Sequence, residues 1–80
     1  MVTVRLFGTL RDKLGCSRIA VDAATVREAL ERVAGSAADR KLLRSCVVFV
    51  NNLPLRSINR LATGLCDGDE IAILPPVSGG

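Results

Sequence analysis

The 80-residue sequence contains no histidine, tryptophan or tyrosine, and its only aromatic residues are two phenylalanines. Without histidine there is no imidazole to act as a general base, a metal ligand or a member of a catalytic triad. Without tryptophan or tyrosine there is little to stack on a base or a sugar. These absences argue against catalysis by the chain alone, and we expect no metal site and no bound cofactor.

Long apolar runs are absent as well. No stretch approaches the ~18 residues that span a bilayer, and the N-terminus lacks the basic region, apolar run and cleavage site of a signal peptide. The three cysteines, Cys16, Cys46 and Cys66, fit neither a disulfide framework nor a C-x-x-C zinc site. We interpret them as free, buried thiols, and we expect a cytoplasmic protein that is neither secreted nor embedded in a membrane.

The charge and composition indicate one globular domain. A chain of this length buries roughly 60 to 65% of its unfolded surface, which leaves no room for an enclosed active site beside a core. The hydrophobic fraction of 49% and the charged fraction of 24% are typical of an ordered chain. The net charge of +3 comes from basic residues scattered along the sequence, so we expect a solvated surface rather than a nucleic-acid site.

The first twenty residues predict two strands. Residues 2–7 alternate with the period of a half-buried strand, which places Val2, Val4 and Leu6 on the core side and Phe7 on the opposite side. Gly8 ends this run, and the following segment predicts a helical turn. Ile19 and Val21 then stand in register for a second strand that returns beside the first.

The periodicity changes after the second strand and predicts a helix. Thr25 and Glu28 form a capping-box pattern, and Gly35 offers a C-terminal stop. The apolar positions recur at steps of three and four residues: Val26, Ala29, Leu30, Val33 and Ala34. We expect this amphipathic helix to lie on the sheet.

The second half of the chain predicts two further strands. After a short helix near residues 39–44, a β-branched and aromatic run at 46–50 predicts a third strand, which ends at a turn-forming asparagine pair. Residues 53–65 predict a loop with a short edge strand. A turn at residues 67–69 precedes a last strand at 70–74, which the following proline pair ends.

These elements predict an α+β fold. A mixed sheet of four or five strands with one main helix packed on one face satisfies the rule that both apolar surfaces must be buried. We expect the domain to span residues 1–76 and a diglycine tail to span residues 77–80.

The tail carries the one group with plausible chemistry. Six residues from Pro75 to Gly80 span at most ~20 Å when extended, enough to carry the terminal carboxylate into another protein. A chain without β-carbons passes through a narrow channel, which favours glycine at its end. An α-carboxylate can attack an activated phosphate and form an acyl adenylate, and a second nucleophile can then displace AMP. The alternatives are a frayed terminus or a glycine scar from expression.

Three segments resemble one known family. "LFGTLRDKLG" at residues 6–15, "VN" at 50–51 and "LCDGDEIAILPPVSGG" at 65–80 resemble the MoaD and ThiS ubiquitin-like sulfur carriers, and in particular the MoaD branch, the small subunit of molybdopterin synthase. The turn, strand, proline pair and diglycine at the end are the most specific part of this resemblance.

The resemblance implies a β-grasp fold and a defined reaction. An activating enzyme uses ATP to adenylate the terminal glycine, here Gly80, and a sulfur donor converts it to a thiocarboxylate. The tail that threads into the partner's active site would comprise Gly79, Ser78, Val77, Pro76 and Pro75. The thiocarboxylate then gives sulfur to a pterin precursor inside a large subunit, in a heterotetramer of two small and two large subunits.

Two rival functions stay open. A related carrier supplies sulfur for thiamine synthesis, cysteine synthesis or tRNA thiolation, and archaeal relatives with the same ending modify lysines of other proteins. The "PPVSGG" ending favours the molybdopterin branch. A further alternative is a small binding domain with an inert tail.

Strand parity predicts where a partner docks. Phe7 and Leu74 point away from the helix, and in a β-grasp fold their strands are neighbours. They would form one exposed apolar patch at the root of the tail, and such a patch usually marks a docking site. The alternative is that residues 53–65 fold over both side chains.

Overall fold

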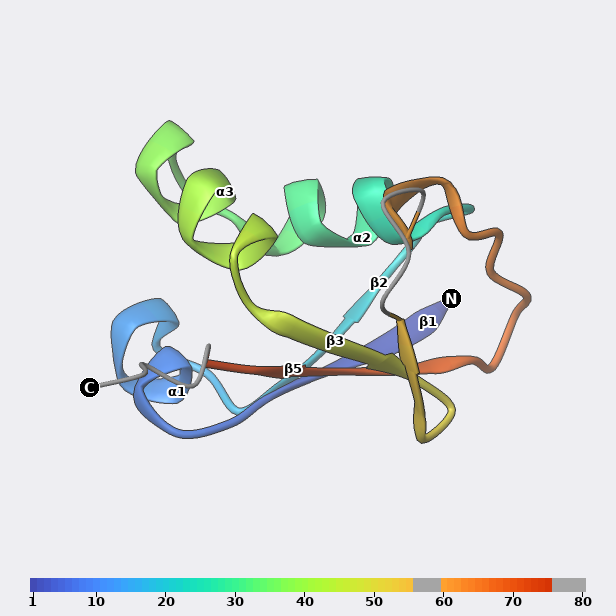
Figure 1. Cartoon of the computed structure of the whole chain (residues 1–80), viewed down its shortest axis with the longest axis horizontal. Coiled ribbons are helices and arrows are strands. Elements are labelled where there is room, and N and C mark those ends of the chain that lie inside the picture. The colour runs from blue at the N-terminus through green and yellow to red at the C-terminus, as the bar shows by residue number, and fades with distance from the viewer. Residues whose placement is uncertain (56–59, 76–80) are drawn as a thin grey trace.

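Five strands form one mixed sheet in the computed structural model, which describes residues 1–55 and 60–75 (Figure 1). The elements in chain order are β1 (Val2–Leu6), α1 (Thr9–Leu14), β2 (Arg18–Val21), α2 (Val26–Val33), α3 (Ala37–Arg44), β3 (Val47–Val50), β4 (Leu53–Leu55), a 3₁₀ turn (Arg60–Ala62) and β5 (Glu70–Leu74). The strands lie in the order β2-β1-β5-β3-β4. The central pair β1 and β5 is parallel and the other pairs are antiparallel. The predicted α+β class with a mixed sheet is therefore confirmed.

Helices α2 and α3 cover one face of the sheet, while α1 lies at the end of the sheet where β5 finishes (Figure 1). The Thr25 hydroxyl accepts a hydrogen bond from the Glu28 N–H at 3.2 Å, as the capping-box pattern predicts. The Glu28 carboxylate in turn accepts from the Ala24 N–H at 2.7 Å, one residue before the expected donor. Helix α2 ends at Val33 and Ala34 is its C-cap, so Gly35 lies one residue beyond the cap.

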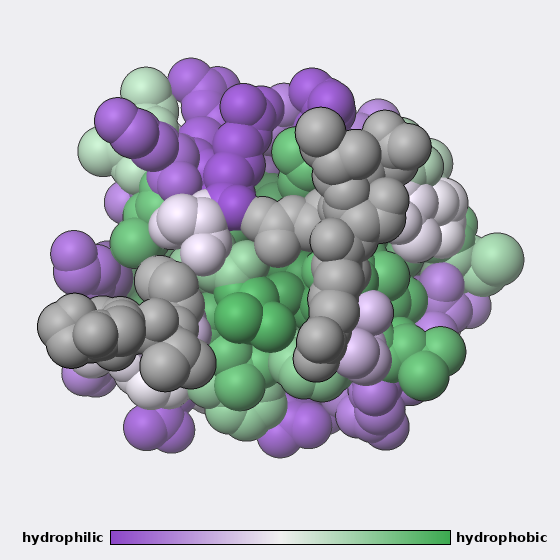
Figure 2. Space-filling view, viewed as in Figure 1, coloured by the Kyte–Doolittle hydropathy of each residue, from purple (hydrophilic) through white to green (hydrophobic). Residues whose placement is uncertain are grey.

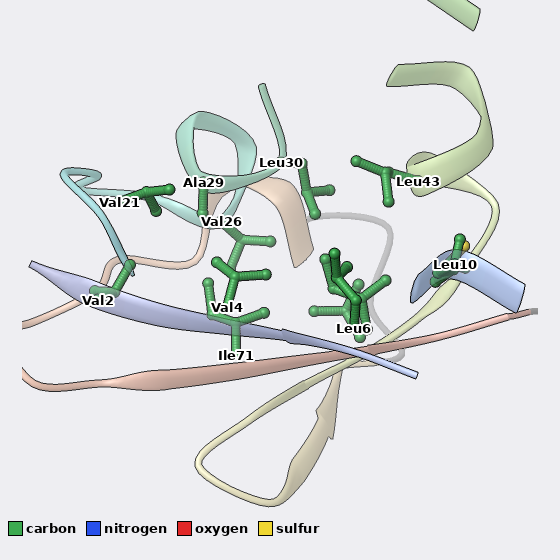
Figure 3. Close-up of a cluster of buried hydrophobic side chains, with 13 residues drawn as sticks. Val2, Val4, Leu6, Leu10, Val21, Val26, Ala29, Leu30, Leu43 and Ile71 are labelled. Carbon is green, nitrogen blue, oxygen red and sulfur yellow. The ribbon is translucent and has the colours of Figure 1, made fainter. Parts of the chain in front are cut away.

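The core lies between the sheet and these helices (Figure 3). In that view Val4, Leu6 and Ile71 extend from the strands toward the helices, and Leu10 comes from α1 at one end. The complete set of buried side chains is Val2, Val4, Leu6, Leu10, Val21, Val26, Ala29, Leu30, Leu43, Cys46, Val48, Ile71 and Ile73. The parity predicted for the first strand is confirmed, because its three core-side residues are all buried.

The segment after β3 is more regular than its composition suggests. Asn51 and Asn52 both have positive φ, 50° and 70°, which is the backbone of the tight turn that joins two antiparallel strands. Residues 53–55 form edge strand β4, and the 3₁₀ turn at Arg60–Ala62 lies against α2. The Val26 N–H donates to the Thr63 carbonyl at 3.0 Å, and this bond ties the segment to the start of α2.

The three cysteines differ in exposure. Cys46 is buried, Cys16 is half-buried and Cys66 is exposed, so the expectation of three buried thiols is wrong for Cys66. Cys66 precedes the turn before β5, and its N–H donates to the Asp69 carboxylate at 2.8 Å.

Within residues 1–55 and 60–75, no helix combines the length and the apolar character needed to cross a bilayer.

Candidate functional site: the tail root and the outer face of the sheet

Strand β5 anchors the residues that lead into the tail. It lies in the middle of the sheet and pairs with β1 on one side and β3 on the other. Ile71 and Ile73 have no exposed surface, so this strand is fixed on three sides. The predicted tail residues 76–80, and with them the boundary between the domain and the tail, lie outside the described residues. Pro75 is described, and it directly follows β5.

Gly8 packs against Pro75 at the point where the chain leaves the sheet. A β-carbon added at Gly8 would lie 3.0 Å from the Pro75 Cγ and 3.4 Å from its Cδ, and Gly8 itself has a φ of +60°. Only glycine adopts this backbone without strain while leaving room for the ring. The β1–α1 turn therefore sets the position of Pro75.

Phe7 and Leu74 lie side by side on the outer face, away from the helices. The Phe7 N–H donates to the Ile73 carbonyl at 3.2 Å, which continues the parallel pairing of β1 with β5 by one residue. Both side chains are half-buried rather than fully exposed. For Phe7 one cause is Arg5, whose guanidinium lies 5.1 Å from the ring centroid.

The outer face extends further across the sheet than the sequence predicted. Val47 pairs with Leu74 in register and is 36% exposed, and Phe49 pairs with Ala72. The alternation of side chains along residues 46–50 could have predicted that Val47 and Phe49 point to the outer face, because the buried residues Cys46 and Val48 alternate with them. We define the outer face by Phe7, Leu74, Val47, Ala72 and Phe49.

The alternative in which residues 53–65 cover this face does not match the described part of that segment. Strand β4 pairs with β3 at the far edge of the sheet, separated from β1 by β3 and β5. The Leu65 N–H donates to the Ala24 carbonyl at 2.8 Å, on the helix side. In the view of Figure 2 hydrophobic residues gather at the centre, below hydrophilic residues of the helix layer, and the outer face of the sheet is turned toward the bottom of the picture.

Electrostatic contacts on the outer face centre on Glu70. Its carboxylate lies 3.4 Å from Arg5 Nη1 and 4.0 Å from Arg18 Nη2. All three side chains are substantially exposed, so these ion pairs contribute little to the stability of the fold.

A second polar cluster closes the turn before β5. Asp69 accepts hydrogen bonds from the Cys66 N–H at 2.8 Å and from Asn51 Nδ2 at 3.1 Å. These bonds favour the ionised carboxylate and hold the pKa of Asp69 below its ordinary value, the Cys66 bond having the larger effect. The amino group of Met1 donates to the Asp67 carboxylate, which raises the pKa of that amino group. Both contacts fix the turn that feeds the last strand.

Within residues 1–55 and 60–75, no group of three or more Cys, Asp or Glu side chains could hold a metal ion.

The sheet order, the helix layer and the glycine-ended chain leaving a central strand together define a β-grasp, ubiquitin-like protein. A family model described as the ThiS family matches residues 4–80. The chain belongs to this family of ubiquitin-like sulfur carriers.

Three relatives illustrate the range of this family. The sulfur carrier protein CysO of Mycobacterium tuberculosis is 40% identical over 50 residues, which are 62% of this chain and 54% of that protein. The chain thus matches about half the length of this curated relative. The solution structure of small archaeal modifier protein 1 from Methanosarcina acetivorans is 34% identical with a TM-score of 0.70, covering 99% of this chain and 95% of that one.

The third is a complex of subunits 1 and 2 of the molybdopterin-converting factor from Helicobacter pylori. The matched chain is 29% identical with a TM-score of 0.64, and the match covers 99% of this chain and 97% of that one. Proteins similar to this chain thus include one solved together with a partner subunit.

Proposed function

We propose that the chain carries sulfur on Gly80 as a C-terminal thiocarboxylate. The observation that carries this proposal is the placement of the tail root. Pro75 directly follows a strand that is hydrogen-bonded on both edges, and Gly8 holds it in position. A partner can then bind the glycine end of the tail without disturbing the packing of the core.

The chemistry follows from the terminal carboxylate. One carboxylate oxygen attacks the α-phosphorus of ATP in the activating enzyme, pyrophosphate leaves, and the glycyl adenylate forms. A sulfur at the oxidation level of hydrosulfide then attacks the carbonyl carbon, the bond from that carbon to the AMP oxygen breaks, and loss of one proton leaves the thiocarboxylate. The described residues include no histidine and no metal-ligand cluster, so the partner supplies the acid, the base and the ATP site.

The molybdopterin branch is the specific role that we propose. The large subunit of molybdopterin synthase receives the tail and holds the pterin precursor, and two small and two large subunits form the complex. Two observations support this assignment: the "PPVSGG" ending of the chain, and the likeness over nearly the whole chain to a molybdopterin-converting factor solved with its second subunit.

A sulfur-transfer assay tests this role. The thiocarboxylated chain is mixed with the large subunit and its pterin precursor, and the dithiolene product and the regenerated carboxylate are quantified. We expect product in proportion to the thiocarboxylate supplied. The chain lacking Gly80 is the control, and we expect it to give none. No product from a chain whose thiocarboxylate has been verified by mass would contradict the molybdopterin role.

A second candidate function is sulfur delivery for cysteine synthesis, or attachment to lysines as a modifier. The likeness to CysO supports the first, and the likeness to the archaeal modifier protein supports the second. Transfer of sulfur to a cysteine precursor, or a covalent adduct with a lysine of another protein, would favour these functions over the molybdopterin role.

A further inference from the structure

We propose that a depression lined by arginines beside the tail root receives aspartate or glutamate side chains of the protein that accepts the tail. This inference rests on the proposed function, because its occupant is the partner that the tail enters. It adds a charge-specific contact beside the apolar outer face and gives the net positive charge of the chain a role.

The depression lies between β1, α1 and the start of β2 and has a volume of about 320 Å³. Its lining residues are Arg5, Leu6, Phe7, Arg11, Ser17 and Arg18. The charged residues among them are all arginines, contributed by three elements that are separate in sequence. We call this site the arginine pocket.

Two of these arginines share one carboxylate partner. The Glu70 carboxylate lies 3.4 Å from Arg5 and 4.0 Å from Arg18, and the Arg5 guanidinium also lies over the Phe7 ring. A single carboxylate cannot neutralise two guanidinium groups. The planar guanidinium keeps further N–H donors directed outward, and these match the two oxygens of another carboxylate.

Arg11 adds a third positive charge on α1. Its side chain is exposed, and no carboxylate of the described residues lies within 4.0 Å of its guanidinium. Its neighbour Asp12 lines an adjoining depression with Arg11 rather than the arginine pocket itself. The pocket therefore presents an unneutralised excess of positive charge.

A protein carboxylate fits this pocket better than a free anion does. Exposed ion pairs gain little in water because salt screens them and the side chains lose freedom. Complementary charge on a partner steers association at long range, and pairs that the partner covers are screened less by salt. Phe7 belongs both to the arginine pocket and to the outer face. The edge of an interface that covers Phe7 and Leu74 therefore lies over the arginines.

Charge reversal with a matched control tests this inference. Binding to the large subunit is measured by calorimetry at several salt concentrations for Arg11→Glu and Arg18→Glu. Arg27→Glu and Arg32→Glu are the controls, because they change the net charge equally from exposed positions on α2, on the other face of the sheet. We expect each pocket variant to bind about tenfold more weakly and with a shallower salt dependence, whereas the controls stay close to the parent.

Neutral substitutions at the same two positions control for misfolding of the charge-reversal variants. Arg11→Gln and Arg18→Gln remove the charge without reversing it, and urea midpoints matching the parent establish that they fold. They should show a smaller loss in the same direction. Pocket variants that bind no more weakly than the α2 controls would overturn the arginine pocket and leave the sulfur-carrier role intact.

Two further outcomes separate the alternatives. A saturable shift of the Ser17 and Arg18 amide resonances on titration of the free chain with inorganic phosphate, at submillimolar concentration, would overturn the inference in favour of a small-anion site. Failure of the parent chain itself to bind the large subunit would contradict the proposed molybdopterin role, and the inferred occupant with it.

Discussion

Gly8 and Pro75 approach each other so closely that a single added methyl group at residue 8 would lie 3.0 Å from the proline ring. Gly8 lies in the turn after the first strand and Pro75 directly follows the last strand, so the contact joins two segments that are far apart in sequence. The consequence is that the β1–α1 turn determines the position of the residue from which the tail begins.

Replacing Gly8 by alanine should therefore disturb the tail as well as the fold. The positive φ alone costs roughly 1–3 kcal/mol for a residue with a β-carbon. Gly15→Ala is the control, because Gly15 also has a positive φ, +76°, but nothing lies within 4 Å of its added β-carbon. We expect both variants to lose stability in urea, and only Gly8→Ala to slow thiocarboxylate formation per folded molecule. Equal rates for the two would show that the Pro75 contact does not position the tail.

Two core truncations should show that the helix and the central strand carry the stability. Leu30 and Ile73 are buried, so Leu30→Ala and Ile73→Ala should each lower the free energy of unfolding by about 2–5 kcal/mol. Leu53→Ala removes the same kind of side chain where it is 69% exposed and should cost far less. Urea midpoints of the three variants test this. Equal midpoints would contradict the assignment of Leu30 and Ile73 to the core.

The stability of the fold should fall in acid partly through Asp69. The pKa of Asp69 in the folded chain lies below the ordinary value of 3.8. Its contribution to the free energy of unfolding is therefore complete above pH 3.8 and is lost as the pH falls through the lower pKa of the folded chain. Asp69→Asn keeps the shape but cannot ionise. We expect the variant to be less stable at neutral pH and to lose less of its stability on acidification. Urea midpoints of parent and variant that stay parallel from pH 7 down to acid denaturation would rule out this contribution.

Phe7→Ser should weaken binding of the large subunit by about 2 kcal/mol if the ring is a central anchor of the interface. The ring is half-buried, so we expect a smaller change in the free energy of unfolding than for the core truncations. Leu53→Ser, on edge strand β4, is the control for loss of an exposed apolar side chain. Calorimetry in which Phe7→Ser and the parent bind equally tightly would exclude Phe7 from the interface.

Much of the fold could be predicted because local signals and burial agree. The last strand has the predicted bounds, 70–74, since a glycine turn precedes it and a proline pair follows it. The helix α3 begins earlier than predicted, at Ala37, because Ser36 caps it by accepting from the Asp39 N–H. That pattern, Ser followed three residues later by Asp, is readable in the sequence.

The outer face was less predictable, because strand parity gives the side of a residue and not its neighbours. Parity placed Phe7 and Leu74 on that side, but it could not show that Arg5 lies over the Phe7 ring. The arginine pocket depends on three elements meeting at the end of the sheet, and no local pattern in the sequence contains that information.

Intact mass measurement tests most directly whether Gly80 becomes the sulfur-bearing residue. The full chain is incubated with its activating enzyme, ATP and a sulfur donor, beside a chain that lacks only Gly80. We predict that the full chain gains the mass expected for replacing one oxygen by sulfur, and that the gain maps to the C-terminal peptide. The shortened chain should fold normally and gain nothing. A full chain whose mass stays unchanged, with an activating enzyme active on another carrier, would contradict the account.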